Sequence, residues 1–170
     1  MGFPDYFNKN AQAAKHLLQG LEPDTFKAVL EKEVIGIACD TTAAGSAEGR
    51  ALFDMSVRLV SRLYPRIRFV ALDAGAKTAI ATGRALAKAI NPNISIDESA
   101  ASVSQWLVIG KTKLPRANEK FVIYVGSSNW PAKLSKKAPQ GVGSPFNPFG
   151  AGVSACPGSP ILFRWAFSNQ

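Results

Sequence analysis

The stretch "EVIGIACD", residues 33–40, is an unbroken apolar run that ends in an acid. A short run without polar alternation is typical of a strand that is buried on both faces. Strands of this kind belong to parallel sheets, and right-handed crossover connections then place helices over both faces. The stretch therefore predicts an α/β protein built on a mainly parallel sheet.

Strand and helix patterns alternate on both sides of this stretch. Further strands are expected at residues 67–73, 105–110 and 121–127, with 130–135 as an antiparallel edge. Helices are expected at residues 46–64, 77–90 and 150–167, and two short ones within residues 10–32. We therefore predict a Rossmann-like, mostly parallel sheet flanked by helices over residues 33–170, after an N-terminal helical segment at residues 1–32.

Length and composition narrow the class of protein. The chain has 170 residues, 46% of them hydrophobic, which suits one folded domain. It has no apolar run long enough to span a membrane and no signal-peptide pattern at its start. A cytoplasmic protein that does not bind a membrane is therefore expected. Cys39 and Cys156 are both expected to be buried thiols. The single histidine, His16, is expected on a helix surface, and no metal site is predicted.

Positive charge is concentrated in the last part of the chain. The net charge is +8, and residues 101–170 hold eight Lys and Arg against one acid. The basic patch consists of Lys111, Lys113, Lys133, Lys136 and Lys137. Such a patch attracts nucleic acid or other anions, but it is also typical of a solvated loop surface. Nucleic-acid binding is the less favoured interpretation, because no aromatic residues are interleaved with the lysines.

The ends of the first two predicted strands hold the candidate nucleotide site, Asp40, Thr41 and Asp73. Ligands of parallel sheets bind beyond the carboxyl ends of the strands. However, the three-glycine phosphate loop is absent after Asp40, and the acids there oppose a phosphate unless a cation intervenes. Asp73 fits equally well as a ribose-binding acid and as the cap of the turn "DAGAK". These residues by themselves predict no cofactor.

Two glycines and several small residues begin the last predicted helix, in "SPFNPFGAGVSAC" at residues 144–156. Either a ligand approaches this backbone closely, or the helix is pressed against a sheet; the packing interpretation is favoured. Asn147 would cap the helix and Pro148 would occupy its first turn. Because a proline inside a helix costs ~3 kcal/mol or more, Pro157 and Pro160 predict a break or kink near Cys156.

The C-terminal third carries a resemblance to a known family. "FVIYVGSSNWPAKLS" followed by "GSPFNPFGAGVSACPGSPILFR" resembles a subset of bacterial ThiF-type proteins, which are relatives of the ubiquitin-activating enzymes. The most specific part is the motif Asn147, Pro148, Phe149, Gly150. The resemblance implies a domain that adenylates a ubiquitin-like carrier protein with ATP and magnesium, or an inactive copy of such a domain.

Departures from the ThiF pattern favour the inactive alternative. The glycine loop after residue 40, the arginine-containing segment after Asp73 and the zinc-binding cysteine pair are all absent. Spacing assembles no catalytic set, so no catalytic residue is predicted. The expectation is a non-catalytic ThiF-like scaffold that binds an active subunit or a ubiquitin-like modifier, with a homo-oligomer as an alternative assembly. The alternatives are an adenylyltransferase with an atypical phosphate loop and a basic nucleic-acid-binding protein.

Overall fold

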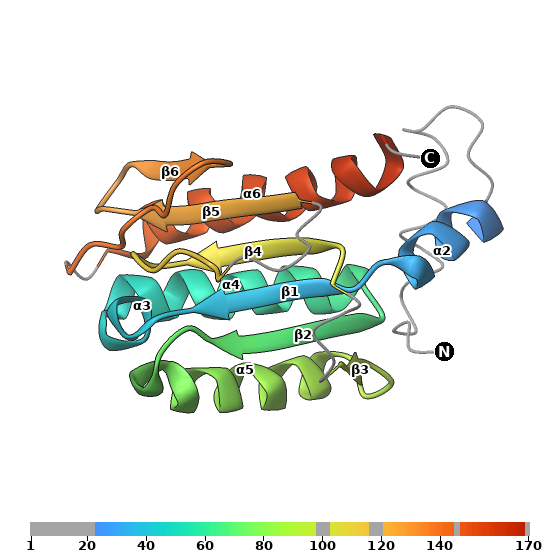
Figure 1. Ribbon diagram of the computed structural model, residues 1–170, viewed down its shortest axis with the longest axis horizontal. Coiled ribbons are helices and arrows are strands. Elements are labelled where there is room, and N and C mark those ends of the chain that lie inside the picture. Colours follow the sequence, from blue (N-terminus) through green and yellow to red (C-terminus); the bar gives the residue numbers. More distant parts are fainter. Residues whose placement is uncertain (1–22, 98–102, 116–120, 145–146, 169–170) are drawn as a thin grey trace.

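A computed structural model describes residues 23–97, 103–115, 121–144 and 147–168 (Figure 1). His16 and the first of the two predicted N-terminal helices lie outside these ranges. The predicted domain boundary after residue 32 stays a prediction.

The elements alternate as the sequence predicts. In chain order they are α2 (Pro23–Lys32), β1 (Ile35–Cys39), α3 (Thr41–Gly45), α4 (Ala47–Leu63), β2 (Arg66–Ala71), the 3-10 helix η1 (Ala74–Ala76), α5 (Lys77–Ile90), β3 (Ser95–Ile96), β4 (Gln105–Ile109), β5 (Phe121–Ser127), β6 (Ala132–Ser135) and α6 (Pro148–Ser168). The six strands form one sheet in the order β3-β2-β1-β4-β5-β6. Only β6 runs antiparallel, against β5. A mainly parallel α/β sheet with helices is therefore confirmed.

The helices cover one face of the sheet, which differs from the predicted two-sided arrangement. Figure 1 shows α4 and α6 behind the strands and α5 beneath β2, and buried residues of α5 belong to the same core as those of α4 and α6. The core on that side is built from alternate residues of the strands, such as Ile37 of β1, Phe69 of β2 and Leu107 of β4. In the described part of the chain, the connections that lead into β4 and β5 contain no helix. In these described stretches no crossover helix covers the second face.

The second face of the sheet has a smaller apolar cluster of its own. Trp106 and Tyr124 belong to it and are 8% and 3% exposed. A Cβ on Gly36 would lie 2.2 Å from the ring of Trp106, so the indole lies directly across the backbone of β1. Both faces of β1 are buried, as the run at 33–40 predicts, although only one of them is covered by helices.

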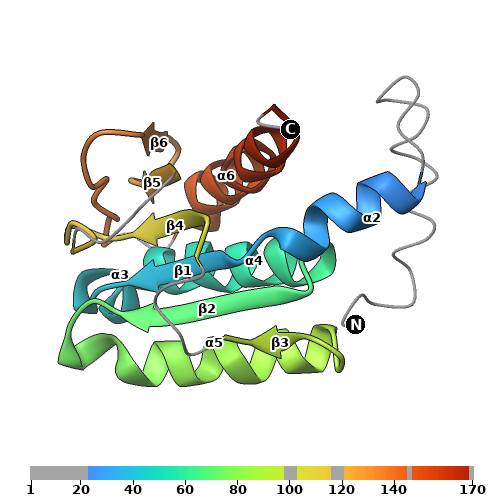
Figure 2. The same cartoon turned by 45° about the vertical axis from the view of Figure 1, so that its right-hand side comes forward.

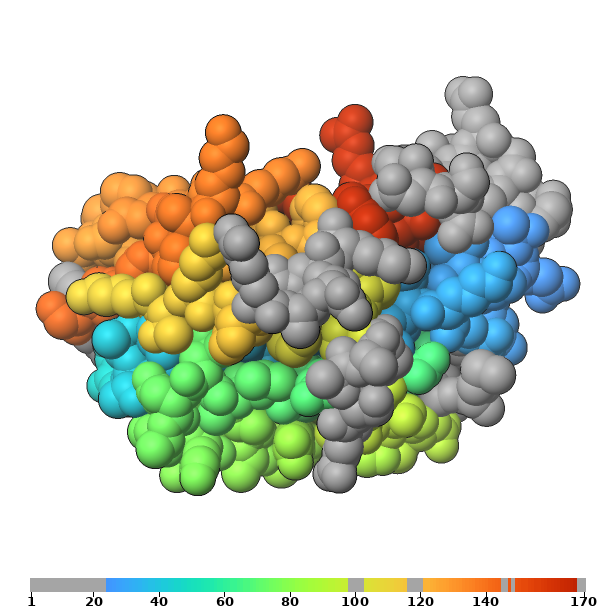
Figure 3. All heavy atoms as spheres, in the orientation of Figure 1, coloured from blue at the N-terminus to red at the C-terminus, as the bar shows by residue number. Residues whose placement is uncertain are grey.

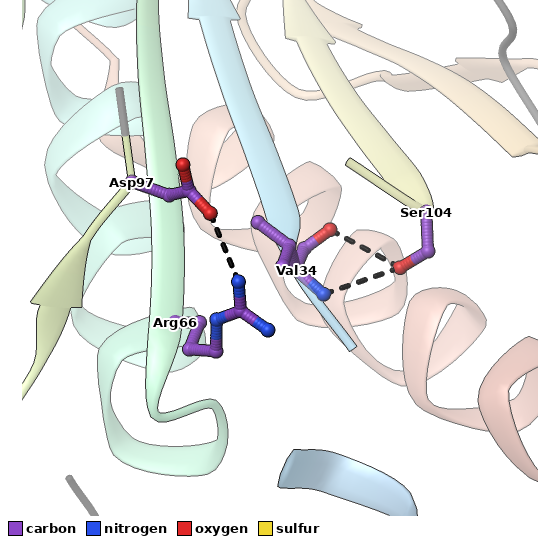
Figure 4. A network of polar contacts seen from close by, with 4 residues as sticks. All are labelled: Val34, Arg66, Asp97 and Ser104. Carbon is purple, nitrogen blue, oxygen red and sulfur yellow. Dashed lines mark hydrogen bonds and ion pairs between the residues drawn. The ribbon is translucent and has the colours of Figure 1, made fainter. Parts of the chain in front are cut away.

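Polar contacts join the strands where β1, β2 and β4 begin (Figure 4). The Ser104 hydroxyl accepts from the Val34 N–H and donates to the Val34 carbonyl, at 3.3 and 3.1 Å. The Arg66 guanidinium pairs with Asp97 at 3.0 Å. This end of the sheet is therefore fixed by contacts within the chain.

The small residues that begin α6 pack against the rest of the molecule. Ala151 and Ala155 are buried, and the Ser154 hydroxyl donates to the Gly126 carbonyl at 2.5 Å. A Cβ on Gly150 would lie 2.2 Å from the Asn129 carbonyl oxygen. The packing interpretation of the glycine-rich stretch is confirmed at these positions.

The break predicted in α6 does not occur. The helix continues from Pro148 to Ser168 with Pro157 and Pro160 inside it. Buried contacts along its inner face, Leu162 and Ala166 among them, hold the residues on both sides of the prolines against the sheet and α4. Tertiary packing therefore outweighs the local penalty of the prolines.

Candidate functional site

The carboxyl ends of β1 and β2 bring Asp40, Thr41 and Asp73 together, as the sequence predicts. Asp40 is 1% exposed and caps α3, accepting from the Ala43 N–H at 3.0 Å. Its other oxygen accepts from the backbone N–H groups of Lys111 and Thr112, at 2.6 and 2.8 Å. Asp40 thus ties the end of β1 to the loop that follows β4.

Gly110 makes room for this carboxylate. Its φ is +120°, and a Cβ there would lie 2.1 Å from Asp40 Oδ1. Burial is the largest single influence on the pKa of Asp40 and raises it. The hydrogen bonds, beginning with that of the Thr42 hydroxyl, together lower the pKa by more than burial raises it, so the pKa is below its ordinary value. The site therefore holds a charged, fully bonded carboxylate.

Asp73 accepts three hydrogen bonds from two residues. It caps η1 by accepting from the Ala76 N–H at 3.1 Å, and it accepts from both the backbone N–H (2.9 Å) and the hydroxyl of Thr41. The Thr41 hydroxyl is the main reason why the pKa of Asp73 is lowered. The turn-cap interpretation describes this geometry directly.

We call the region around Asp40, Thr41 and Asp73 the β1/β2 crevice. The backbone N–H groups that a phosphate would need here, at Thr41 and Ala43, already donate to the two carboxylates. The arrangement locks two turns together without a ligand. Nucleotide binding at these residues stays a prediction. Among the described residues, no group of three or more His, Cys, Asp or Glu side chains is placed to hold a metal ion.

The basic patch is distributed over the half of the sheet that β4, β5 and β6 form. Lys111 follows β4 and lies near Gly141, whereas Lys136 follows β6 and places its ammonium 5.1 Å from the ring centre of Phe121. Lys133 sits on β6 opposite Gly126. Figure 3 shows the segments that carry these lysines side by side, yellow for residues 103–115 and orange for 121–144. Lys111, Lys133 and Lys136 therefore lie on or next to β4, β5 and β6, and nucleic-acid binding by the basic patch stays a prediction.

A second region lies where β5 ends and α6 begins. The rings of Trp130 and Phe149 stack there with centroids 4.9 Å apart, although the two residues are 68% and 61% exposed. The Asn147 side chain accepts from the Phe149 N–H at 3.0 Å, which confirms Asn147 as the residue that caps α6. The motif Asn147, Pro148, Phe149, Gly150 therefore starts the helix and presents an aromatic ring to solvent.

A buried acid holds the turn that carries Trp130. Glu48 of α4 is 1% exposed, and its Oε2 accepts from the Asn129 N–H at 3.3 Å. The Asn129 carbonyl accepts from the Gly150 N–H at 2.9 Å, and Asn129 itself has a φ of 61°. A strained residue and a buried carboxylate thus fix an exposed tryptophan in place.

An apolar groove continues from this aromatic pair between α4 and α6, which lie side by side in Figure 2. Its volume is about 520 Å³, and its lining consists of Met55, Phe149, Gly152, Val153, Cys156 and Pro157. We call it the α4/α6 groove. Met55, Phe149 and Val153 are among the exposed large hydrophobic residues of the described chain. Sequence reasoning missed the groove, although apolar residues at positions 149, 153, 156 and 160 recur at helical spacing opposite the small ones.

The two cysteines lie in opposite surroundings. Cys39 is buried at the end of β1, as predicted, and burial followed by the charges of Asp40 and Asp73 raises its pKa to about 12. Cys156 is exposed in the α4/α6 groove, so the prediction that it is buried is wrong. The reason is that α6 turns its small residues inward at 151 and 155, which places 156 on the outer side.

A further cavity of about 440 Å³ lies between α3, α4 and α5. Cys39 and Phe53 lie in its wall, with Arg50 and Thr78 also in the lining. It is next to the β1/β2 crevice, and sequence reasoning did not anticipate it.

Comparison with known proteins decides the family. The model of prokaryotic E2 family C matches residues 38–168, which is most of the chain. The chain belongs to prokaryotic E2 family C. It is also 39% identical, over all 170 residues, to the uncharacterized protein y4jF of Sinorhizobium fredii (strain NBRC 101917 / NGR234). This E2 family chain spans about a third of that relative, 32% of its length.

The family match corrects the resemblance drawn from the sequence. The E2 family points to ubiquitin conjugation, so the prediction of a ThiF-type adenylation domain, active or inactive, is wrong. The predicted scaffold role in a ThiF-type system is wrong with it. The motif at residues 147–150 carried the resemblance. Its observed features are a helix cap and close packing, and helices that pack against sheets share them in many families. In the described ranges, no helix of this E2 family chain is long and apolar enough to cross a membrane.

Proposed function

We propose that this chain is an E2-like domain of a ubiquitin-like conjugation system, and that Cys156 carries the modifier protein as a thioester. The observation that carries the proposal is the family match over residues 38–168. The relative y4jF is about three times as long, so the activity of the whole protein is part of the proposal. A cytoplasmic location and a protein partner belong to it as well.

The choice of Cys156 follows from the chemistry of acyl transfer. A conjugating domain needs a nucleophile that accepts an activated carboxyl group and later yields it to an amine, and a thiolate is suited to this task. Cys39 is disfavoured, because its pKa of about 12 leaves almost no thiolate at neutral pH and because it is buried. Cys156 is exposed and lies in a groove that a protein segment could enter.

Each transfer balances in atoms and electrons. The Cys156 thiolate attacks the activated carbonyl carbon at the modifier's C-terminus, an S–C bond forms, and the activating group leaves with its electron pair. An acceptor amine then attacks the thioester carbonyl, the N–C bond forms, and Cys156 leaves as the thiolate while the amine loses a proton. No oxidant or reductant is required.

The Rossmann-like description of the sheet also stays a proposal. The order β3-β2-β1-β4-β5 supports it, because dinucleotide-binding sheets share that order. The single helical layer of the described residues is the main departure from that type.

The test is the chemical nature of an adduct formed in the organism that produces the chain. We expect the tagged wild-type chain to carry a protein adduct that excess thiol releases. The Cys156→Ser variant should carry the same adduct as an oxygen ester, which resists thiol but is cleaved by hydroxylamine. Cys39→Ala is the matched control and should keep the thiol-sensitive adduct. An adduct that persists unchanged as a thioester in Cys156→Ser, or no adduct in either chain, would contradict the proposal.

A further inference from the structure

We propose that the cavity of about 440 Å³ between α3, α4 and α5 binds a small organic acid, whose carboxylate pairs with Arg50 and whose aromatic or aliphatic body fills the apolar interior. We call it the α3/α5 cavity. Figure 1 shows α3 above the beginning of α5, at the end of the molecule that holds the cavity. The inference goes beyond the proposed function and does not rest on it, because neither Cys156 nor the α4/α6 groove takes part.

The first argument is that the interior of the cavity is apolar and uncharged. Its apolar lining comes from the end of β1 and from the three helices: Cys39, Ala44, Phe53, Ala79, Gly83 and Leu86. All six are buried or half-buried. Burial raises the pKa of the Cys39 thiol to about 12, so the thiol is neutral and adds no charge. Pockets of about 300–1,000 Å³ with such linings are typical sites for small organic ligands.

The second argument is that close contacts on two sides hold the cavity open. A Cβ on Gly75 would lie 2.3 Å from the Thr41 hydroxyl oxygen, and a Cβ on Gly83 would lie 2.6 Å from the ring of Phe53. The helix η1 therefore touches α3, and α5 touches α4, so closely that the helices cannot collapse into the cavity. Asp73 fixes the first contact by accepting from the Thr41 N–H at 2.9 Å. The cavity is thus formed before a ligand arrives, and binding orders little of the chain.

The third argument is a guanidinium group at the rim that has no carboxylate partner. Arg50 lies in the lining, and its Nη1 donates to the carbonyls of Ala44 and Gly45 at 3.3 and 3.2 Å, which fixes the group at the end of α3. Among the described carboxylates none pairs with Arg50, since Asp54, one turn further along α4, pairs with Arg58 at 2.6 Å. The Nε and Nη2 hydrogens of Arg50 are left for a ligand. This edge of a guanidinium binds a carboxylate through two parallel hydrogen bonds.

The other polar groups near the cavity favour a single carboxylate over a phosphate. Asp54 also belongs to the lining, and its pair with Arg58 is half-exposed, so a doubly charged anion would be repelled more than a singly charged one. The backbone N–H groups of Thr41 and Ala43, which a phosphate would need, already donate to carboxylates of the chain. The ligand is therefore expected to carry one negative charge at one end of an uncharged body.

The test is the binding of phenylpropionate, its neutral amide and propionate to the full chain, measured by titration calorimetry. We expect phenylpropionate to bind with a dissociation constant below about 1 mM, which a ligand of its size reaches at ordinary efficiency. The amide loses the charge and propionate loses the ring, so each should bind at least about tenfold more weakly. Bound phenylpropionate should also slow the reaction of the Cys39 thiol with a small disulfide reagent, because Cys39 lies in the lining.

Two variants locate the binding in the cavity, and each has a matched control. Arg50→Gln removes the charge and should reduce the affinity for phenylpropionate to about that for the amide. Its control is Arg62→Gln, which is exposed on the same helix outside the lining. Ala79→Leu fills the interior and should weaken the acid and the amide at least about tenfold, whereas Ala85→Leu, exposed on α5, should change neither. Circular dichroism checks that all four variants are folded.

The outcomes separate this inference from the proposed function. Binding of the acid that Arg50→Gln weakens and that slows the Cys39 reaction would support the inference, whether or not Cys156 carries a thioester. Absence of phenylpropionate binding up to about 10 mM, or equal binding of the acid and the amide, would overturn it. Binding that Ala79→Leu leaves unchanged would place the acid elsewhere on the chain and would overturn it as well.

Discussion

The β1/β2 crevice and the α4/α6 groove lie at different strands of one sheet. They differ in whether their side chains have partners within the chain. In the crevice, Asp40 and Asp73 are each bonded to several donors from neighbouring turns. In the groove, exposed apolar side chains lie beside a free thiol. The crevice stands where sheets of this class bind ligands, yet its polar groups are already partnered within the chain.

This difference teaches that the position of a site in a fold and its readiness to bind are separate properties. A polar cluster whose donors and acceptors are paired contributes to stability. An apolar surface that stays exposed stabilises the fold less than a buried one does. An apolar surface that is exposed and held rigid therefore points to a partner that covers it. The comparison makes four predictions, taken from the largest expected effect to the smallest.

Replacing Asp40 should destabilise the fold strongly. Asp40→Ala leaves the N–H groups of Ala43, Lys111 and Thr112 without their acceptor, and hydrogen bonds to a charged group are worth about 1.5–3 kcal/mol each. We expect a loss of at least about 3 kcal/mol in the free energy of unfolding, measured by urea denaturation. Asp54→Ala, at an exposed ion pair on α4, is the control and should change little.

The effect of Asp40 should also depend on pH. Because its pKa is lowered in the folded state, the carboxylate stabilises the protein fully above the unfolded-state value of about 4, and this stabilisation is lost as the pH falls through the folded-state pKa. The difference in stability between wild type and Asp40→Asn should therefore be constant near neutrality and shrink in acid. A difference that grows in acid would contradict the assigned charge state.

The two thiols should react at very different rates. Cys39 is buried with a pKa of about 12, whereas Cys156 is exposed, so an aromatic disulfide reagent at pH 8 should modify Cys156 more than about 100-fold faster. The measurement is the release of the coloured thiol in the native protein. Cys156→Ser should lose the fast phase entirely and retain the slow one. Two fast phases in the wild type would show that the reagent reaches the Cys39 thiol, which would contradict its burial.

Replacing a groove residue should cost little stability. Phe149→Ser removes a ring that is 61% exposed, so the expected loss is below about 1 kcal/mol in thermal or urea unfolding. Leu162→Ala, on the buried side of the same helix, is the comparison and should cost about 2–5 kcal/mol. Similar losses in the two variants would mean that the groove is part of the core and not a binding surface.

The sequence predicts the elements of the fold well where the pattern is local. The run at 33–40, the helix at 77–90 and the strand at 121–127 fall at or within about a residue or two of the observed bounds. The short β3 and α3 were not predicted, because a two-residue strand and a five-residue helix leave no periodic signal. The one-sided helical layer was also missed, since strand burial looks the same whether helices or loops cover it.

The candidate site was predicted in part. The sequence brings Asp40, Thr41 and Asp73 to one edge, because parallel strands end together. It could not show that these groups satisfy one another, since the donors at Lys111 and Thr112 lie about 70 residues away along the chain. Nor did it show that Trp130 meets Phe149, which depends on the turn at Asn129 and its contact with α4.

The sequence alone determined that a mainly parallel sheet forms, because hydrophobic runs and helical periodicity are set by neighbours along the chain. Tertiary structure alone decided that α6 continues through two prolines and that Cys39 and Cys156 have opposite exposure. Both outcomes depend on which face of a helix or strand meets the core. That is decided by packing between distant segments, where burial of many side chains outweighs a local penalty of a few kcal/mol.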